Sequence, residues 1–496
     1  MIAKVKTAVT KGFNSALVVA ECSISRGLPA FNIVGLADKA IAESRERVRS
    51  AITSSGFKFP VGRITINLIP ADLSKDGSHL DLAIAIAIAI LVASNQLKQT
   101  DVDKTLFIGE LGLSGELHSV SGIIGFSECA KKAGLNNIIL PAENANQASL
   151  ININVIKATT LNSVIMHVLG EQILPTCKLD IVKNNCSYPL TIDNIFGQNF
   201  AKRALVIAAA GHHNILFTGP PGSGKTMLAK SLPSLLPNMT KKEILETSKI
   251  YSLANESDDI ITRRPFRSPH HTASYVALVG GGAKITPGEI SLSHNGVLFL
   301  DEIPEFSSRT LEALRQPLED HKINISRASN KATYPANFML LATMNPCPCG
   351  YYGDPKHECS CTIQAINSYQ KKISGPLLDR IDLFVPVTRV PQKDLSKPTN
   401  NSNKFEIIRE NIKDARKLQI KRQNKANSNL SNKEINEIIK IEGDAKNMLL
   451  EASEKLALSA RSYFKVMRVA RTIADLSRRE SIQINDIAEA LQYRNH

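Results

Sequence analysis

Apolar and polar positions over residues 1–170 follow the pattern of a mixed α/β domain. Short stretches rich in β-branched residues have the length and composition of strands, at 16–24, 63–68, 106–111 and 137–140. Other segments have the spacing of apolar residues that favours helices, at 38–55, 81–91 and 122–133. The run LAIAIAIAILVA is too short to span a bilayer, so it predicts a helix buried in this domain.

The pattern changes further along the chain. A polar stretch at 178–188 predicts a linker over 171–190, whereas 191–388 alternate short, apolar strands with helical segments. Strands of that kind are typical of a parallel sheet buried on both faces. Pro, Ser, Asn and Lys dominate 389–403, which predicts a second linker, and 404–496 are strongly helical. The fold class is therefore an α/β multidomain protein with a C-terminal helical domain.

Composition narrows the class of partner. A chain of 496 residues with 43% hydrophobic residues is long enough for two to four globular domains. Its 60 Lys and Arg against 46 Asp and Glu give a net charge of +14, which favours a polyanion such as nucleic acid. A compositional bias of the genome is the alternative. The start, MIAKVKTAVTKGF, lacks a signal-peptide pattern, and four cysteines are scattered without a pairing pattern, Cys22, Cys129, Cys177 and Cys186. We therefore expect a cytoplasmic protein without a membrane partner.

The stretch NILFTGPPGSGKTMLAKSL combines an apolar strand, a glycine-rich loop and a helix, and matches GxxxxGK[ST]. Glycines let backbone N–H groups converge on phosphate oxygens, and the helix adds its positive N-terminal end. We expect the ammonium of Lys225 to reach the β- and γ-phosphates of ATP and the hydroxyl of Thr226 to hold Mg²⁺. The whole predicted loop is Gly219, Pro220, Pro221, Gly222, Ser223, Gly224, Lys225 and Thr226.

Polar residues end the next two apolar strands. GVLFLDEI ends in two carboxylates, of which Asp301 is placed to bind Mg²⁺ through water and Glu302 to polarise the attacking water. Phosphoryl transfer depends on such positioning and charge stabilisation more than on covalent chemistry. FMLLATMN ends at Asn345, which is placed to orient the same water.

In this order, and followed by Arg380 in SGPLLDRID, the residues resemble the AAA+ ATPase series of Walker A, Walker B, sensor-1 Asn and arginine finger. The resemblance implies a ring, a homo-hexamer, in which Arg380 reaches the γ-phosphate of a neighbouring subunit. It also implies that Ile195, Gly197 and Gln198 in DNIFGQNFAKRAL pack on adenine. Arg461 then stands at the sensor-2 position of a C-terminal helical lid.

Two predicted hairpins carry basic residues. The first contains the glycine cluster 280–282 and Lys284, and the second, HKINISRASNKATYPANF, places Arg327 and Lys331 near its tip. Both resemble the pore hairpins of the AAA+ branch that includes Mg-chelatase and the replicative MCM motors. In a ring's channel these cations would grip DNA phosphates without reading bases. The alternative is a pair of solvent-facing loops.

The stretch CPCGYYGDPKHECSC holds four of the eight cysteines. Four thiolates can form a tetrahedral Zn²⁺ site, and the glycines and proline suit a small loop with little core of its own. The CxC pairs are closer together than the common C-x₂₋₄-C spacing, so simple buried thiols and a redox switch are alternatives. The expected ligands are Cys347, Cys349, Cys359 and Cys361, with His357 as a spare.

The front domain resembles the Lon-type proteases, an S5-like fold. LIPADLSKDGSHLDLAIAIAIAIL is similar to their serine segment, and GLSGELHSVSGIIGFSECAKKAGLNNIILPAEN is similar to their lysine segment. The place of the serine falls on His79, with Ser78 one position early, and the place of the lysine falls on Ile124. A Ser–Lys dyad needs a hydroxyl within reach of a desolvated amine. We therefore expect a Lon-like scaffold without peptidase activity.

Three strings, FRSPHH, NPCPCGYYGDP and LSARSYFKVMRVARTIADL, together with the front domain, resemble the ComM/YifB group of Mg-chelatase-like ATPases over nearly the whole chain. The resemblance implies a hexameric DNA helicase that promotes branch migration during natural transformation, on single-stranded and branched DNA and alongside recombination proteins. Three alternatives stay open: a Mg-chelatase-type motor for metal insertion, an ATP-dependent protease, and a ring that only holds DNA.

Overall fold

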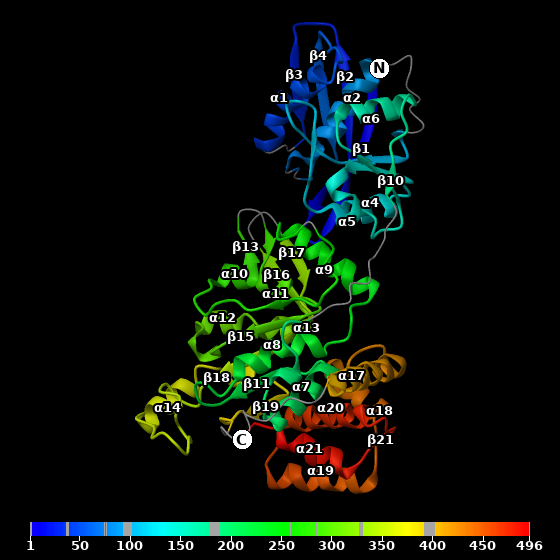
Figure 1. Ribbon diagram of the computed structural model, residues 1–496. Helices are drawn as coiled ribbons and strands as arrows, with labels where there is room; N and C mark the ends of the chain where they lie inside the picture. The colour runs from blue at the N-terminus through cyan, green and yellow to red at the C-terminus, as the bar shows by residue number, and fades with distance from the viewer. Residues whose placement is uncertain are drawn as a thin grey trace. The chain divides into compact units, whose positions relative to one another are not determined.

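The computed structural model describes residues 2–35, 39–73, 75, 77–92, 102–177, 188–257, 259–282, 285–326, 331–390 and 402–495 (Figure 1). Internal contacts divide the chain into two compact units. Unit 1 comprises Met1–Asn184, Lys241–Thr262 and Ser326–Tyr334. Unit 2 comprises Asn185–Thr240, Arg263–Ile325 and Pro335–His496. The domain boundaries drawn from the sequence stay a prediction.

Unit 1 is built on a mixed sheet with the strand order β10-β9-β8-β5-β1-β2-β4-β3. The two longest strands, β1 and β2, form an antiparallel hairpin that pairs Ile2 with Ser23 and Lys11 with Asn14. The strands are β1 (Ile2–Lys11), β2 (Asn14–Ser25), β3 (Ala30–Val34), β4 (Arg63–Ile69), β5 (Thr105–Phe107), β8 (Asn137–Pro141), β9 (Asn154–Ala158) and β10 (Thr176–Cys177). A small separate sheet pairs β6 (Glu110–Leu111) with β7 (Leu117–His118).

Helices cover both faces of this sheet. Successive side chains of a strand point to opposite faces, so Val5 and Val9 of β1 join the apolar cluster of α2, whereas Ala8 joins that of α4. Because α2 consists almost entirely of Ala, Ile and Leu, it is buried along nearly its whole length. The helices are α1 (Lys39–Ser54), α2 (Asp81–Val92), α4 (Ile123–Lys132), α5 (Ala145–Ala148), α6 (Leu161–Leu169) and α9 (Lys241–Leu253).

Most of the elements predicted for the front domain are confirmed. The strands expected at 16–24, 63–68 and 137–140 are β2, β4 and β8, and the three expected helices are α1, α2 and α4. The strand expected at 106–111 is wrong, because it is two strands, β5 and β6. Between them, the backbone of Gly109 pairs with His79 and Leu82 instead of with a neighbouring strand, at 3.0 and 3.1 Å.

Unit 2 contains a parallel sheet with the order β12-β15-β18-β11-β19. Its central strands are buried and, apart from Thr343 in β18, apolar, as the sequence predicts for a sheet covered on both faces. The strands are β11 (Ile215–Thr218), β12 (Phe266–Arg267), β15 (Val297–Leu300), β18 (Met339–Met344) and β19 (Leu383–Pro386). The helices of this part are α7 (Asn199–Gly211), α8 (Lys225–Leu235), α10 (Tyr275–Val279), α11 (Glu289–Leu292), α12 (Ser308–Glu312), α13 (Arg315–Asp320), α14 (Ile363–Gln370) and α15 (Gly375–Leu378).

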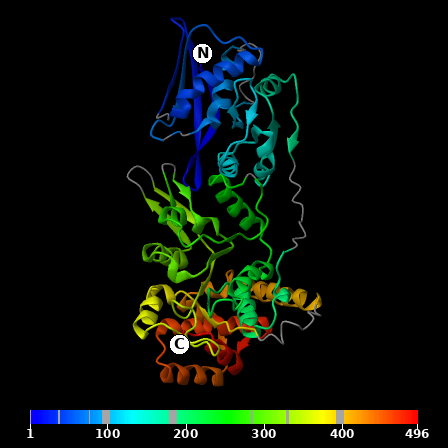
Figure 2. The ribbon, with the colours of Figure 1, turned by 60° about the vertical axis from the view of Figure 1, so that its left-hand side comes forward.

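The C-terminal part of unit 2 is helical, as predicted, and its helices gather together in orange and red in Figures 1 and 2. They share one apolar cluster with α7 and α8. The elements are α17 (Ser402–Gln423), α18 (Asn432–Ile438), α19 (Gly443–Lys455), α20 (Ala460–Leu476) and α21 (Ile484–Gln492), with a small sheet of β20 (Lys440–Ile441) and β21 (Ser481–Ile482).

Both predicted hairpins are present as short two-stranded sheets. The first pairs β13 (Gly280–Gly281) with β14 (Thr286–Pro287), and the second consists of β16 (Lys322–Ser326) and β17 (Lys331–Pro335). Of the basic residues expected near their tips, Lys331 is exposed at the start of β17. Lys284 and Arg327 lie outside the described residues.

Candidate active site

Three polar loops leave the same edge of the parallel sheet in unit 2. The loop 219–224 follows β11, the pair Asp301 and Glu302 follows β15, and Asn345 follows β18. The strands β15, β18 and β11 are neighbours and parallel, so their carboxyl ends meet. Ligands of open α/β sheets bind at this kind of edge.

Backbone conformation and close packing explain why loop 219–224 contains glycines. Gly222 and Gly224 have φ of 74° and 92°, in the left-handed region that residues with a Cβ rarely adopt. Gly219 passes so close to the next strand that a Cβ there would lie 2.1 Å from the carbonyl oxygen of Val387. The helix α8 starts at Lys225, so its N-terminal N–H groups open toward the loop.

Lys225 connects this loop to the neighbouring strand. Its Nζ donates hydrogen bonds to the carbonyl oxygens of Gly219 at 2.6 Å and Pro220 at 3.0 Å, and to Oδ1 of Asn345 at 3.1 Å. Burial lowers the pKa of Lys225, while the carboxylates of Asp301 and Glu302 act in the opposite direction. A buried ammonium beside carboxylates can exchange its bonds to carbonyl oxygens for bonds to phosphate oxygens, so it is suited to binding a phosphate.

Asp301 lies between two hydroxyl groups. Thr226 donates from Oγ1 to one carboxylate oxygen at 3.2 Å, and Thr343 donates to the other at 2.5 Å. A hydroxyl and a carboxylate in contact provide the oxygen donors that Mg²⁺ prefers, so these two predicted residues fit the ion. Thr343, which the sequence interpretation missed, also accepts the backbone N–H of Glu302 at 2.9 Å. Its signal was a hydroxyl inside the otherwise apolar strand FMLLATMN.

Glu302 has the geometry of a residue that projects out of its strand. Its φ is 52°, and its side chain is exposed while Asp301 is half-buried. The hydrogen bond from its N–H to Thr343 holds this uncommon backbone conformation in place. The carboxylate is therefore available to a water molecule on the phosphate side of the sheet edge.

The segment expected to contact adenine lies against the loop. The side-chain amide of Gln198 donates to the carbonyl oxygen of Ser223 at 3.2 Å and to that of Thr388. Gly197 has a φ of 60°, and a Cβ on it would lie 3.3 Å from Val390. Ile195 is buried just before them. Of the three residues, Gln198 is bonded to the phosphate loop, and the contact of all three with a base stays a prediction.

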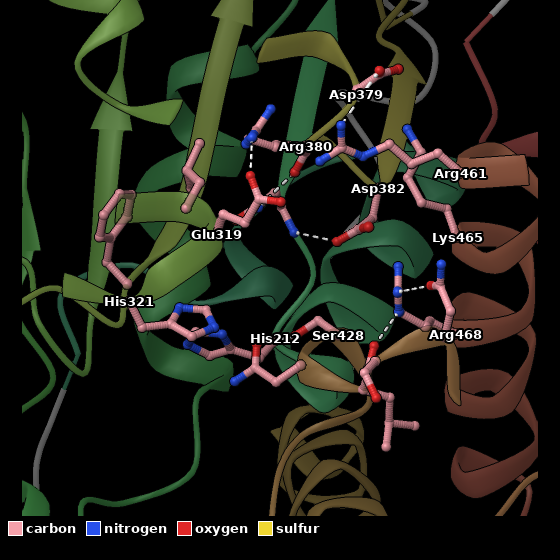
Figure 3. Close-up of a pocket in the computed structure, with 17 residues that line it drawn as sticks. His212, Glu319, His321, Asp379, Arg380, Asp382, Ser428, Arg461, Lys465 and Arg468 are labelled. Atoms are coloured by element: carbon pink, nitrogen blue, oxygen red, sulfur yellow. Dashed lines mark hydrogen bonds and ion pairs between the residues drawn. The ribbon is translucent and has the colours of Figure 1, made fainter. Parts of the chain in front are cut away.

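Arg380 and Arg461 lie in a separate pocket of about 510 Å³ (Figure 3). Arg380 is ion-paired with Glu319 and donates to the carbonyl oxygen of Pro376 at 2.7 Å, while Arg461 is 3.7 Å from Asp379. Among the described residues, neither arginine bonds to the phosphate loop of its own chain. The sequence did not indicate that Glu319 pairs with Arg380, because Glu319 lies in α13, far from Arg380 along the chain.

The four predicted cysteines form one cluster. Their sulfur atoms all lie within 4.8 Å of one another, with Cys347 3.3 Å from Cys349 and each of these 3.6 Å from Cys359. Bonds of 2.3 Å from a tetrahedral zinc imply sulfur atoms about 3.8 Å apart, so the donor set fits that ion. The backbone N–H of Tyr351 lowers the pKa of Cys349 to about 6, which favours the thiolate.

The cysteine loop also touches the phosphate loop. A Cβ on Gly350 would lie 2.6 Å from Cδ of Pro221, so the backbone of Gly350 lies close to the ring of Pro221. His357, the spare ligand of the prediction, is not part of the sulfur cluster. Its ring instead lies 5.0 Å from that of Tyr351.

In unit 1, the residues at the protease-like positions make other contacts. His79 lies 3.0 Å from the carbonyl oxygen of Ala8 and its ring stacks on Phe126 at 4.9 Å. Ser78 donates its hydroxyl to Glu110, and Ile124 is fully buried in the apolar cluster of α4. Among the described residues, Ser78 thus has a carboxylate partner and no amine.

A parallel sheet whose edge joins a P-loop lysine, an Mg²⁺-type hydroxyl–carboxylate pair and a strand-end asparagine defines a P-loop ATPase core of the AAA+ type. Family models agree: "Magnesium chelatase, subunit ChlI" matches residues 191–395, "Subunit ChlI of Mg-chelatase" matches 20–144, and "Magnesium chelatase, subunit ChlI C-terminal" matches 402–494.

Similar proteins identify the family more closely. The chain is 44% identical to competence protein ComM of Haemophilus influenzae over 99% of its own length and 97% of the relative's. It is 43% identical to YifB of Escherichia coli, over 99% and 96%. It is 23% identical to the magnesium-chelatase 67 kDa subunit of Chlorobaculum parvum, over 40% of this chain and 27% of that one. The chain belongs to the ComM/YifB family of Mg-chelatase-like ATPases. Among the described residues, no helix has both the length and the apolar character needed to cross a membrane.

Proposed function

We propose that this protein is an ATP-driven DNA translocase that works as a homo-hexamer and promotes branch migration when incoming single strands recombine with a chromosome. ATP hydrolysis is supported by two hydrogen bonds at one sheet edge, which connect Lys225 to Asn345 and Thr226 to Asp301. The DNA part is supported by the name of the ComM relative, a competence protein, and by the net charge of +14.

The chain's own residues account for hydrolysis in this proposal. The loop's N–H groups and Lys225 bind the phosphates, and Thr226 with Asp301 would hold Mg²⁺, which neutralises charge on the phosphate oxygens. Glu302, exposed at the strand end, accepts hydrogen bonds from the attacking water, and Asn345 orients it. The γ-phosphate would then lie beside Lys225. Arg380 completes the site from the neighbouring subunit, in agreement with its pocket being apart from its own P-loop.

The remaining parts have supporting roles in the proposal. The front domain is a Lon-like scaffold without peptidase activity, because Ser78 is bonded to Glu110 and Ile124 occupies the lysine position. The cysteine cluster is a structural zinc site. The protein acts in the cytoplasm, together with recombination proteins on single-stranded and branched DNA.

A Mg-chelatase-type motor that remodels a protein partner for metal insertion is the second candidate. It is favoured by the three family models, all of which carry the chelatase name. It is disfavoured by the extent of the match: the similarity to the chelatase subunit covers only 40% of this chain, whereas the similarity to ComM covers 99%.

The decisive experiment is ATP-dependent migration of a labelled four-way DNA junction by the purified full-length protein, with Lys225→Ala as the inactive control. Migration by the wild type alone would support the motor and its DNA substrate together. If DNA neither stimulates hydrolysis nor is moved while ATP is hydrolysed, the translocase proposal is wrong and the partner-remodelling motor becomes the better account.

A further inference from the structure

A groove of about 620 Å³ runs along the first helix of the lid, α17. One wall consists of Pro237, Asn238 and Thr240, and the other of residues of α17 between Glu406 and Lys421. All of these residues belong to unit 2. The nucleotide site and the two hairpins do not contribute to the groove, so it is a separate feature of the molecule.

Four cations form a row along this groove. Arg409, Lys413, Lys417 and Lys421 are spaced four residues apart, which places them on one face of the helix over about 18 Å. The three lysines are exposed. Arg409 donates to the side-chain oxygen of Asn238 at 3.0 Å, which ties the row to the opposite wall.

The row is not explained by the stability of the helix. Like charges four residues apart repel each other, so the arrangement works against α17. Lys417 has a carboxylate partner, Asp414 at 3.2 Å, but within the described part of the chain Lys413 and Lys421 have none. The two acidic residues of the groove, Glu406 and Glu410, stand toward the start of the helix. Positive charge therefore increases toward Lys421.

The lining chemistry distinguishes between forms of nucleic acid. Sites for single strands usually stack bases on aromatic side chains, and none lines this groove. A row of flexible ammonium groups beside the aliphatic side chain of Ile420 is suited instead to phosphates and sugars, which carry no sequence information. A duplex carries one phosphate per 3.4 Å of helix axis on each strand, so a row of about 18 Å is long enough to meet several phosphates.

We propose that the α17 groove binds the sugar–phosphate backbone of a duplex arm of the DNA on which the motor acts. The inference rests on the proposed function, since it assumes a DNA substrate. It adds a contact on the lid that involves no residue of the two hairpins. Such a contact holds a duplex arm without regard to sequence.

The test compares two triple variants of the full-length protein with equal loss of charge. The test variant is Lys413→Gln, Lys417→Gln and Lys421→Gln. The control is Lys433→Gln, Lys440→Gln and Lys455→Gln, three lid lysines with side chains 84%, 76% and 76% exposed. Binding of a fluorescein-labelled blunt duplex, and of the matching single strand, is followed by anisotropy over a salt series.

We expect the test variant to bind the duplex about tenfold or more weakly near physiological salt. Its slope of log K against log salt should be shallower than that of the wild type by about 2.7, since each lost phosphate contact removes about 0.9. The control should keep the wild-type slope. The melting temperature of the test variant should change little, because the loss of the exposed Lys417–Asp414 ion pair offsets the repulsion relieved along α17.

Three outcomes contradict the inference while leaving the proposed function intact. Wild-type slope and affinity in the test variant would show that the groove does not bind DNA. Equal losses in both triple variants would show that only net charge matters. An equal or larger loss for the single strand would exclude the duplex assignment. A wild type that binds no DNA at all would instead contradict the proposed function, and with it this inference.

Discussion

The ammonium of Lys225 donates a 3.1 Å hydrogen bond to the side-chain oxygen of Asn345, so the P-loop and the tip of β18 are directly connected. The same Nζ is bonded to two carbonyl oxygens of the loop. A γ-phosphate held by Lys225 would therefore lie within reach of Asn345. In the proposed mechanism, this contact links phosphate binding at the P-loop to the positioning of the attacking water by Asn345.

Lys225→Ala should weaken ATP binding about 10- to 100-fold, because it removes a charged hydrogen-bond donor worth about 1.5–3 kcal/mol. The matched control is Lys230→Ala, which removes an exposed lysine from the same helix, α8, and should bind ATP like the wild type. Titration with a fluorescent ATP analogue measures both. Burial lowers the pKa of Lys225, so its ammonium loses the proton at a lower pH than an exposed lysine does. The affinity of the wild type for ATP should therefore begin to decline at that lower alkaline pH. Unchanged affinity in Lys225→Ala would exclude the assigned role.

Glu302→Gln should slow ATP hydrolysis by at least about 100-fold while ATP binding is retained, since it removes the base that polarises water but not a phosphate ligand. The variant should accumulate as an ATP-bound form on DNA. Glu305→Gln is the control, because Glu305 is three residues further on and is 3.7 Å from Lys372 at the surface. Single-turnover hydrolysis separates the two. A wild-type rate in Glu302→Gln would show that another group activates the water.

The nucleotide site could be predicted because its residues stand at the ends of apolar strands. A loop, two carboxylates and an amide that follow three neighbouring parallel strands must meet at one sheet edge. Thr343 was missed because an inward hydroxyl in an apolar strand has no strong sequence pattern. Its role depends on the register of β15 against β18, which places it beside Asp301 and Glu302.

Other features depend on contacts between distant segments, which periodicity does not reveal. The helix α9 follows the P-loop helix in sequence, yet it belongs to unit 1, where Lys249 pairs with Glu128 at 2.5 Å and Ser252 accepts the N–H of Gly122. The strand β1 was missed because the alternation of its first residues ends at Thr7, Ala8 and Val9, which are all buried. Arg380 pairs with Glu319 from a distant segment of the chain, and the sequence of neither segment indicates this pairing.

Arg380→Ala should bind ATP normally and hydrolyse it at least about 100-fold more slowly, because arginine fingers stabilise transition-state charge and not the bound nucleotide. If the finger acts on a neighbouring subunit, mixing Arg380→Ala with Lys225→Ala should restore part of the activity. At some interfaces of a mixed ring, the P-loop of an Arg380→Ala subunit then meets the intact Arg380 of a Lys225→Ala subunit. The measurement is steady-state ATP hydrolysis against mixing ratio. A mixture no more active than its components would show that Arg380 acts within its own chain or not at all.

Asp81→Ala should lower the free energy of unfolding of unit 1 by about 3–5 kcal/mol, because the buried Asp81 carboxylate is 2.7 Å from Nε of Arg47 and accepts from Ser44. Glu43→Ala is the control: its carboxylate is 4.0 Å from the same arginine and 74% exposed, so the loss should be below about 1 kcal/mol. Urea unfolding followed by circular dichroism compares them. Equal stability of the two variants would mean that the buried pair contributes nothing net.

The wild type, purified under reducing conditions, should contain one zinc per chain. Cys347→Ser with Cys361→Ser should remove it, because two of four thiolate ligands are lost. Cys129→Ser with Cys177→Ser removes two cysteines outside the cluster and should keep the metal. Elemental analysis gives the zinc content. Since Gly350 lies against Pro221, loss of the metal should also weaken ATP binding, by less than Lys225→Ala does. A metal-free wild type would leave the cluster as four reduced thiols, and ATP binding should then be the same in both double variants.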